Sequence, residues 1–145
     1  MSDSFYLDIY WTLRKTVNGL KTYLHNKLAD SGISWPQFHA LYHIPEKGIP
    51  VNELAKELHC NASNITGLID RMIENKWVYR EHSEEDRRVW LIKLTDEGSA
   101  LKTRLIPEHH KNIRERLSVL NEQELANLKA LLKKLMNEGE LKVKK

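Results

Sequence analysis

Cysteine is almost absent from this chain of 145 residues, since Cys60 is the single example. One thiol cannot form an internal disulfide, and it cannot supply a cysteine-based zinc site within one chain. Long apolar segments are missing as well: there is no run of 18 apolar residues, and the start, MSDSFYLDIYW, lacks the basic and then apolar order of a signal peptide. We therefore expect a cytoplasmic protein in a reducing compartment, with no membrane partner.

The motifs of common enzyme sites are also missing. The chain has no glycine-rich phosphate loop, no nucleophile-elbow serine and no convincing constellation of acid and base groups. We therefore predict that the protein is not an enzyme and carries no cofactor.

The apolar content is sufficient for one ordinary domain, because hydrophobic residues make up 41% of the sequence. The net charge of +3 is only mildly basic. The stretch from 50 to 95 holds seven Lys and Arg residues against eight Asp and Glu residues. Composition is therefore weak evidence for a nucleic-acid partner, and a DNA-binding function must depend on where individual basic residues lie.

The stretch from 51 to 95 has the pattern of a winged helix-turn-helix. Its first part predicts two short helices joined by a tight turn, and Asn61 is placed to cap the second helix. One face of that helix is apolar, with Ile65, Leu68, Ile69 and Met72. The opposite face is small and polar, with Ala62, Ser63, Asn64, Thr66 and Gly67. This helix therefore has an apolar back for the core and a polar face for a partner.

A hairpin with a charged tip is predicted after these helices. Two strand-like runs, Trp77–Arg80 and Val89–Leu94, lie on either side of residues 83–88, SEEDRR, which are too polar to be buried. Thr95 is placed to cap the next helix.

Long amphipathic helices are predicted on both sides of this module. The first covers about residues 4–29, and Ser34 starts a short helix with Gln37 completing a capping box. Asn121 is placed to cap the last helix, which we expect to end at Gly139. The long helices carry narrow apolar stripes, which pairing with a second copy would bury, so we predict a two-fold homodimer.

We therefore predict a mainly α fold: a winged helix-turn-helix with a small β-hairpin wing, extended by long N- and C-terminal dimerisation helices. We expect a single domain over residues 1–145. Within it, about 1–32 and 100–145 would form the dimerisation helices, and about 33–98 the DNA-binding winged helix.

Four segments carry a resemblance to a known family: SWPQFHALYHI, NELAKEL, ASNITGLIDRMIENKWVYR and DRRVWLIKLTDEG. They resemble the MarR family of bacterial transcriptional regulators. The last segment is the most specific, because an Asp-x-Arg at the wing tip followed at fixed spacing by Leu-Thr-x-x-Gly is typical of that family.

The resemblance implies a sequence-specific regulator, most often a repressor, which binds a pseudo-palindromic operator in double-stranded DNA as a homodimer. The second helix of the 51–95 stretch, which Asn61 caps, would be the recognition helix and would enter the major groove. The wing arginine would enter the adjacent minor groove. The major-groove residues would be Asn61, Ala62, Ser63, Asn64, Thr66 and Gly67. Arg71 and Arg87 would contact phosphate, and Arg88 would be the minor-groove residue, held by Asp86. Many family members carry an arginine where this chain has Gly67, so here glycine would instead allow a close approach of the backbone.

The resemblance also implies a cleft for a small aromatic or anionic effector. Aromatic and imidazole groups are concentrated on the first two helices, and we select Trp11, His39 and Tyr42 as pocket candidates. The alternative for each of these side chains is a place in the core.

Three other functions are weighed against this one. His39, His109 and His110 with Glu108 suggest a metal-responsive regulator, but the ligand set is incomplete and we assign no metal ligand. Cys60 suggests a redox-responsive regulator, although at this position we expect a buried, inert thiol. A winged helix that is used only for protein contacts also fits the near-neutral charge of the module.

Overall fold

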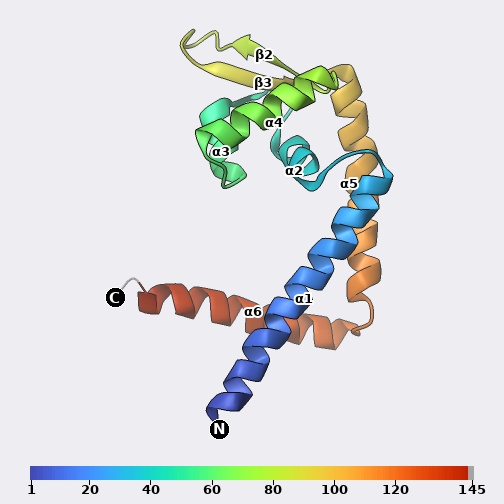
Figure 1. Ribbon diagram of the computed structural model, residues 1–145, viewed down its shortest axis with the longest axis vertical. Helices are drawn as coiled ribbons and strands as arrows, with labels where there is room; N and C mark the ends of the chain where they lie inside the picture. The colour runs from blue at the N-terminus through green and yellow to red at the C-terminus, as the bar shows by residue number, and fades with distance from the viewer. Residues whose placement is uncertain (144–145) are drawn as a thin grey trace. The chain divides into compact units, whose positions relative to one another are not determined.

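The protein is described by a computed structural model, which places the backbone of residues 1–143 and the side chains of residues 1–138 (Figure 1). The chain divides into two compact units, Met1–His110 and Lys111–Lys145. Each unit is described by itself below.

The fold is the predicted winged helix-turn-helix with long flanking helices. The helices are α1 (Asp3–Asp30), α2 (Trp35–His43), α3 (Val51–Glu57), α4 (Ala62–Glu74), α5 (Asp96–Leu117) and α6 (Glu122–Val143). The strands are β1 (Ile49–Pro50), β2 (Val78–His82) and β3 (Trp90–Leu94).

Local hydrogen bonds start the helices where the sequence predicts. The Ser34 hydroxyl accepts a hydrogen bond from the Gln37 amide at 3.3 Å, and the Gln37 side chain accepts one from the Ser34 amide at 3.1 Å. Asn61 Oδ1 accepts a hydrogen bond from the Asn64 amide at 2.9 Å and so caps α4. The same arrangement at Asn121 starts α6. These caps satisfy amides of the first turn that have no partner within the helix.

The sheet has one strand more than the predicted hairpin. Its order is β1-β3-β2, with both pairs antiparallel, and Ile49 lies opposite Ile92. For the segment that forms β1 the sequence predicts only a break in the chain before the next helix, because Pro45, Gly48 and Pro50 lie there. Its pairing with β3 is a tertiary contact, for which a strand of two residues provides no periodic pattern.

The core of the first unit lies beneath α4 and the sheet. All four residues predicted for the apolar back of α4 are buried. They pack in one cluster with side chains from α2, α3, the sheet and α5, among them Leu41, Leu54, Val78, Ile92 and Leu105. This packing turns the polar face of α4 outward. Figure 1 shows the hairpin of β2 and β3 beside α4.

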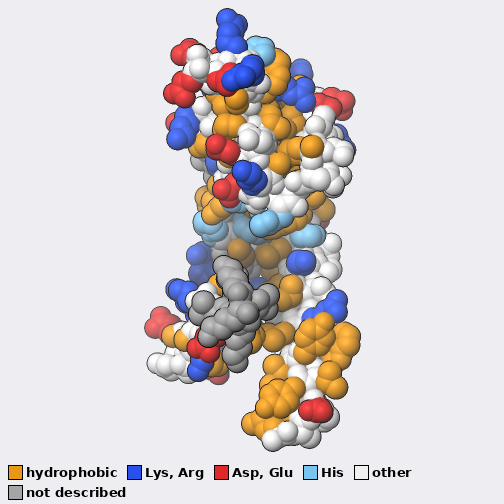
Figure 2. All heavy atoms as spheres, turned by 90° about the vertical axis from the view of Figure 1, so that its left-hand side faces the viewer, with side chains coloured by type: hydrophobic (Ala, Val, Ile, Leu, Met, Phe, Trp, Pro, Cys, Tyr) orange, Lys and Arg blue, Asp and Glu red, His pale blue; other side chains and the backbone are white. Residues whose placement is uncertain are grey.

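The terminal helices leave much apolar surface uncovered. Of the stripe predicted along α1, only Leu28 is buried. The exposed hydrophobic residues of α1 are Phe5, Tyr6, Leu7, Ile9, Tyr10, Trp11 and Val17. Figure 2 shows them as an apolar surface over the N-terminal half of the helix. In the second unit, α6 exposes Leu131, Leu132, Leu135 and Met136.

The prediction that Gly139 ends the last helix is wrong, because α6 continues to Val143. Glycine inside a helix costs about 1 kcal/mol relative to alanine but does not force the helix to stop. Over the residues that are described, no helix is both long and apolar enough to cross a membrane.

Candidate nucleic-acid interface

The outer face of α4 is free to meet a partner. Asn61, Ala62, Ser63, Asn64, Thr66 and Arg71 are exposed, and Gly67 is half-buried. The Thr66 hydroxyl donates to the Ala62 carbonyl at 2.9 Å. The Asn64 side chain makes no hydrogen bond within residues 1–138, so its amide can both donate and accept.

The wing tip presents an arginine that a carboxylate holds in place. Arg88 Nε and Nη2 lie 3.1 Å and 3.2 Å from the two oxygens of Asp86, and the Arg88 amide also donates to Asp86 at 3.1 Å. These hydrogen bonds lower the pKa of Asp86 from its ordinary value. The Arg88 side chain is nevertheless 91% exposed. The pairing therefore orients the guanidinium without covering it.

A hollow of about 810 Å³ lies between α4, the predicted recognition helix, and the wing, which is the hairpin of β2 and β3. Ala62 and Thr66 of α4 line one side, and Arg80, Arg88 and Trp90 of the hairpin line the other. The residues that line it, all in the described part of the chain, include two arginines and no Asp or Glu. At its edge Arg80 Nη2 lies 2.7 Å from Asp70 Oδ1, which joins β2 to α4. The structure therefore brings Arg88 and the face of α4 to one basic hollow.

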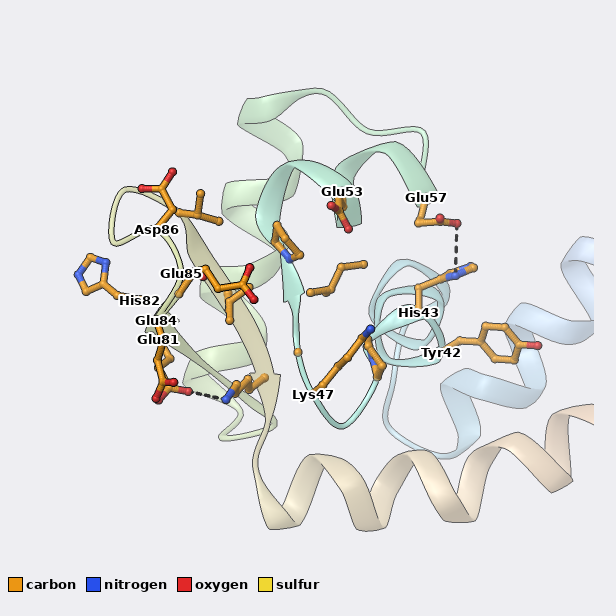
Figure 3. Close-up of a pocket in the computed structure, with 18 of the residues that line it drawn as sticks. Tyr42, His43, Lys47, Glu53, Glu57, Glu81, His82, Glu84, Glu85 and Asp86 are labelled. Carbon is orange, nitrogen blue, oxygen red and sulfur yellow. Dashed lines mark ion pairs between the residues drawn. The ribbon is translucent and has the colours of Figure 1, made fainter.

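The other side of the wing has the opposite charge. A second hollow, of about 830 Å³, lies between the wing, β1 and α3 (Figure 3). Its acidic residues are Glu53, Glu57, Glu81, Glu84, Glu85 and Asp86. Glu81 pairs with Lys93 at 2.7 Å, and Glu57 lies 3.7 Å from His43. The two sides of the wing thus differ in charge, since one hollow is basic and the other is mainly acidic.

The three effector-pocket candidates do not form one group. Tyr42 lies at the edge of the acidic hollow, and its ring points away from it (Figure 3). The His39 ring stacks on Trp35 at 5.4 Å. Burial, followed by the nearby His43 and His59, lowers the pKa of His39. Trp11 lies apart on α1, where its ring contacts Tyr10 at 5.2 Å and faces Arg14.

A cluster of aromatic rings and imidazoles joins α1, α2 and α5 around Trp35. The indole stacks on His25 of α1 at 5.2 Å, and it lies 5.7 Å from His109 of α5. His109 is buried, 4.7 Å from the ring of Phe38, and burial lowers the pKa of its imidazole. The sequence prediction omitted His25 and considered His109 only as a metal ligand. Helical spacing links Trp35 to His39, but only tertiary packing brings His25 and His109 to the same ring.

The residues considered for metal or redox sensing are dispersed or covered. His109 is buried, whereas Glu108 and His110 are exposed. Among the residues that the structure describes, no group of three or more His, Cys, Asp or Glu side chains is placed to hold a metal ion. Cys60, which we expected to be buried, is only half-buried against the core, and its Sγ lies 3.6 Å from the Leu58 carbonyl oxygen.

Comparison with known proteins gives consistent matches. The model of the MarR family matches residues 33–90. The chain is 36% identical over 104 residues to the HTH-type transcriptional regulator PecS of Dickeya dadantii, a match that covers 69% of this chain and 63% of PecS. The chain thus spans less than two thirds of that relative.

Two further matches cover more of the compared proteins. The multiple antibiotic resistance protein MarR of Salmonella typhimurium is 31% identical over 115 residues, which are 78% of this chain and 80% of that protein. The crystal structure of an S. aureus MepR–DNA complex superposes with a TM-score of 0.76 at 25% identity, over 89% of this chain and 96% of that one.

Proposed function

We propose that this chain, which belongs to the MarR family and is therefore a transcriptional regulator and not an enzyme, represses transcription by binding a pseudo-palindromic DNA operator as a homodimer. The observation that carries this proposal is the basic hollow between α4 and the wing. It places an exposed polar helix face and an exposed arginine on either side of a surface lined by no carboxylate. Such a surface suits the phosphate backbone of DNA.

Individual residues take different roles in this proposal. Asn64 has a free amide, which suits the paired donor and acceptor on the major-groove edge of adenine, and Thr66 has a methyl group to meet the methyl of thymine. Arg71 and Arg87 contact phosphates. Arg88 enters the minor groove, where a narrow A·T-rich sequence has a strongly negative potential.

The homodimer is proposed from the uncovered apolar surfaces of α1 and α6. Exposed aromatic and aliphatic side chains gather on both helices, and burying such surface is the main source of free energy for stable association. Two copies of α4 would then read two half-sites of one operator.

We also propose that a small aromatic or anionic effector modulates DNA binding through the aromatic residues of α2. His39 and Tyr42 lie on this helix, which packs beneath the DNA-binding face. Titration with benzoate in the presence of operator tests this point: release of DNA by wild type, reduced in a His39→Ala variant, is expected. Release that is equal in the two proteins contradicts a role for His39.

The DNA-binding proposal is tested with a duplex selected by the protein from a random-sequence pool. Footprinting should show two half-sites centred about 10 base pairs apart on one face of the duplex. Affinity should fall steeply with salt, because phosphate contacts release counterions. A single asymmetric footprint contradicts binding as a dimer, and sedimentation at micromolar concentration that shows only a 17.0 kDa species rules out the homodimer.

The wing assignment is tested with Arg88→Ala. Each dimer carries two wings, so the variant should lower the slope of log affinity against log salt by about two. The protein should remain folded, because Arg88 is exposed and the polar partner of its side chain within residues 1–138 is Asp86 in the same loop, so its loss uncovers no core residue. An unchanged dissociation constant at fixed salt contradicts a role for Arg88 in binding DNA.

A further inference from the structure

The strand register aims Trp90 at the recognition helix. Trp90 lies opposite His82 in the antiparallel pair of β2 and β3, two residues before Ile92. Side chains two residues apart on a strand share one face of the sheet. Val78 and Ile92 on this face are buried in the core beneath α4, and Arg80 and Trp90 continue the same face into the basic hollow. His82, opposite Trp90, borders the acidic hollow on the other side of the wing. Trp90 therefore lies where the core face of the wing emerges into the basic hollow.

A neighbouring ring supports the Trp90 side chain, but no core packing covers it. Its indole stacks on the His82 imidazole with centroids 3.7 Å apart and planes 29° apart. Trp90 remains 44% exposed and lines the basic hollow with Thr66 and Arg88. A large aromatic side chain held flat against a second ring has little rotational freedom left, and it is ready to make a contact.

The geometry of B-DNA indicates what the Trp90 side chain contacts. This inference rests on the proposed function, which is DNA binding by α4 and the wing. If α4 occupies a major groove and Arg88 the adjacent minor groove, the sugar–phosphate strand that separates these grooves must cross the hollow between them. Trp90 lines the same hollow as Thr66 of α4 and Arg88 of the wing. Its indole face can pack on a deoxyribose, and its Nε1–H is a donor with no acceptor function, which suits a phosphate oxygen.

We propose that Trp90 is a DNA-contacting residue of the wing, which packs against the sugar–phosphate strand between the two grooves, and that His82 is a positioning residue that holds the indole in place. The contact is made to the backbone, so it adds affinity for any sequence and leaves base discrimination to α4. The wing thus binds through the inner face of its strands as well as through its tip.

The alternative role for this pair is structural, since cross-strand aromatic pairs stabilise hairpins. The two roles differ in their salt dependence. Trp90 is uncharged and releases no counterions, so loss of a direct contact lowers affinity at every salt concentration by the same factor. Loss of hairpin structure would instead displace Arg80 and Arg88, and it would lower the slope of the salt dependence.

The test measures binding to the duplex selected by wild type from a random-sequence pool. Trp90→Ala should weaken binding of the dimer about a hundredfold, which is about tenfold for each of its two wings and is the loss expected for a hydrogen bond to a charged group together with its ring contact. The salt slope should equal that of wild type, whereas Arg88→Ala lowers it. His82→Ala should also weaken binding, and His82→Phe, which keeps the stacked ring, should restore it.

A spectroscopic readout locates the contact. The chain has four tryptophans, so protein labelled with 5-fluorotryptophan should give four fluorine resonances, of which Trp90→Phe identifies one and Trp11→Phe provides a control. Addition of the duplex should shift the Trp90 resonance in wild type and shift it less in His82→Ala. Wild-type affinity in Trp90→Ala, a reduced salt slope in that variant or an unmoved Trp90 resonance each overturn the proposal. Failure of wild type to select or bind any duplex would instead overturn the proposed function.

Discussion

Replacing Gly98 with alanine should loosen the junction between the wing and α5. Gly98 is buried in the first turn of α5, and a Cβ atom built there lies 1.9 Å from the Trp77 carbonyl oxygen and 2.8 Å from its carbonyl carbon. The obstructing atoms belong to the backbone, so no side-chain rotation relieves the clash. The helix and the strand entry must separate by about 1.1 Å before the nearest contact reaches even 3.0 Å.

The hydrogen bonds at this junction determine the magnitude. Thr95 Oγ1 accepts from the Gly98 amide at 3.0 Å and donates to the Lys76 carbonyl at 2.6 Å, and the Thr95 amide donates to the Trp77 carbonyl at 3.0 Å. A separation of this size breaks the cap of α5 or the bond to Trp77. A lost cap costs about 1 kcal/mol and a lost hydrogen bond about 1 kcal/mol, so we expect a loss of about 1–2 kcal/mol, which lies within the range for overpacking.

The assay is urea unfolding followed by far-ultraviolet circular dichroism at one fixed protein concentration, because association would make stability depend on concentration. Gly19→Ala is the matched control, since Gly19 lies inside α1 and a Cβ there meets no atom within 4 Å. This control should be more stable than wild type by up to about 1 kcal/mol. Wild-type stability in Gly98→Ala, or an equal loss in both variants, would refute the reasoning from close packing.

Three further predictions concern the recognition helix and the histidine cluster. Asn61→Ala should lower the free energy of unfolding by about 1 kcal/mol, because it removes the cap of α4. Asn61→Asp should keep wild-type stability in denaturation experiments, because it retains the cap, yet it should weaken DNA binding, because it adds a negative charge. Equal affinity of Asn61→Asp and wild type for DNA would exclude Asn61 from the interface. Gly67→Ala should stabilise the fold by up to about 1 kcal/mol, since the new methyl group meets only Arg71 Nη1, at 3.6 Å. The affinity of this variant for the operator should fall. An unchanged dissociation constant would contradict a close approach of the Gly67 backbone to DNA. Burial lowers the pKa of His109, so the unfolded chain binds more protons than the folded chain as the pH drops below 6.5, and the free energy of unfolding should decrease as the pH decreases. His109→Phe should remove part of this pH dependence in unfolding curves measured between pH 8 and 5. An identical pH dependence in the variant and in wild type would argue against burial as the cause.

Prediction from sequence succeeded where the determining interactions are local. The caps at Ser34 and Asn61 each depend on a hydrogen bond to an amide three residues away, so a short stretch contains both partners. The apolar back of α4 follows from helical periodicity, and the Asp86–Arg88 pair lies within one turn of chain. The polar face of α4 and the pairing that orients Arg88 could therefore be predicted from the order of the residues alone.

Prediction failed where partners are distant in the sequence. Strand β1 exists because Ile49 meets Ile92, and a segment of two residues has no period of its own. The cluster at Trp35 gathers His25 and His109 from helices that are far apart along the chain. In both cases the stabilising contact forms only after the chain has folded back on itself.

The balance of charge shows this division most clearly. The sequence alone determined that residues 50–95 carry nearly equal numbers of acidic and basic side chains, and by itself that count favours no partner. The tertiary structure decided where those charges lie, because alternate residues of a strand point to opposite faces of the sheet. Arg80 and Trp90 thus line the hollow beside α4, while Glu81 and Lys93 line the hollow on the other side of the wing, where acidic residues of α3 and of the wing tip join them. The sum of the charges is a property of the sequence, but their separation requires a folded hairpin with α3 and α4 packed beside it.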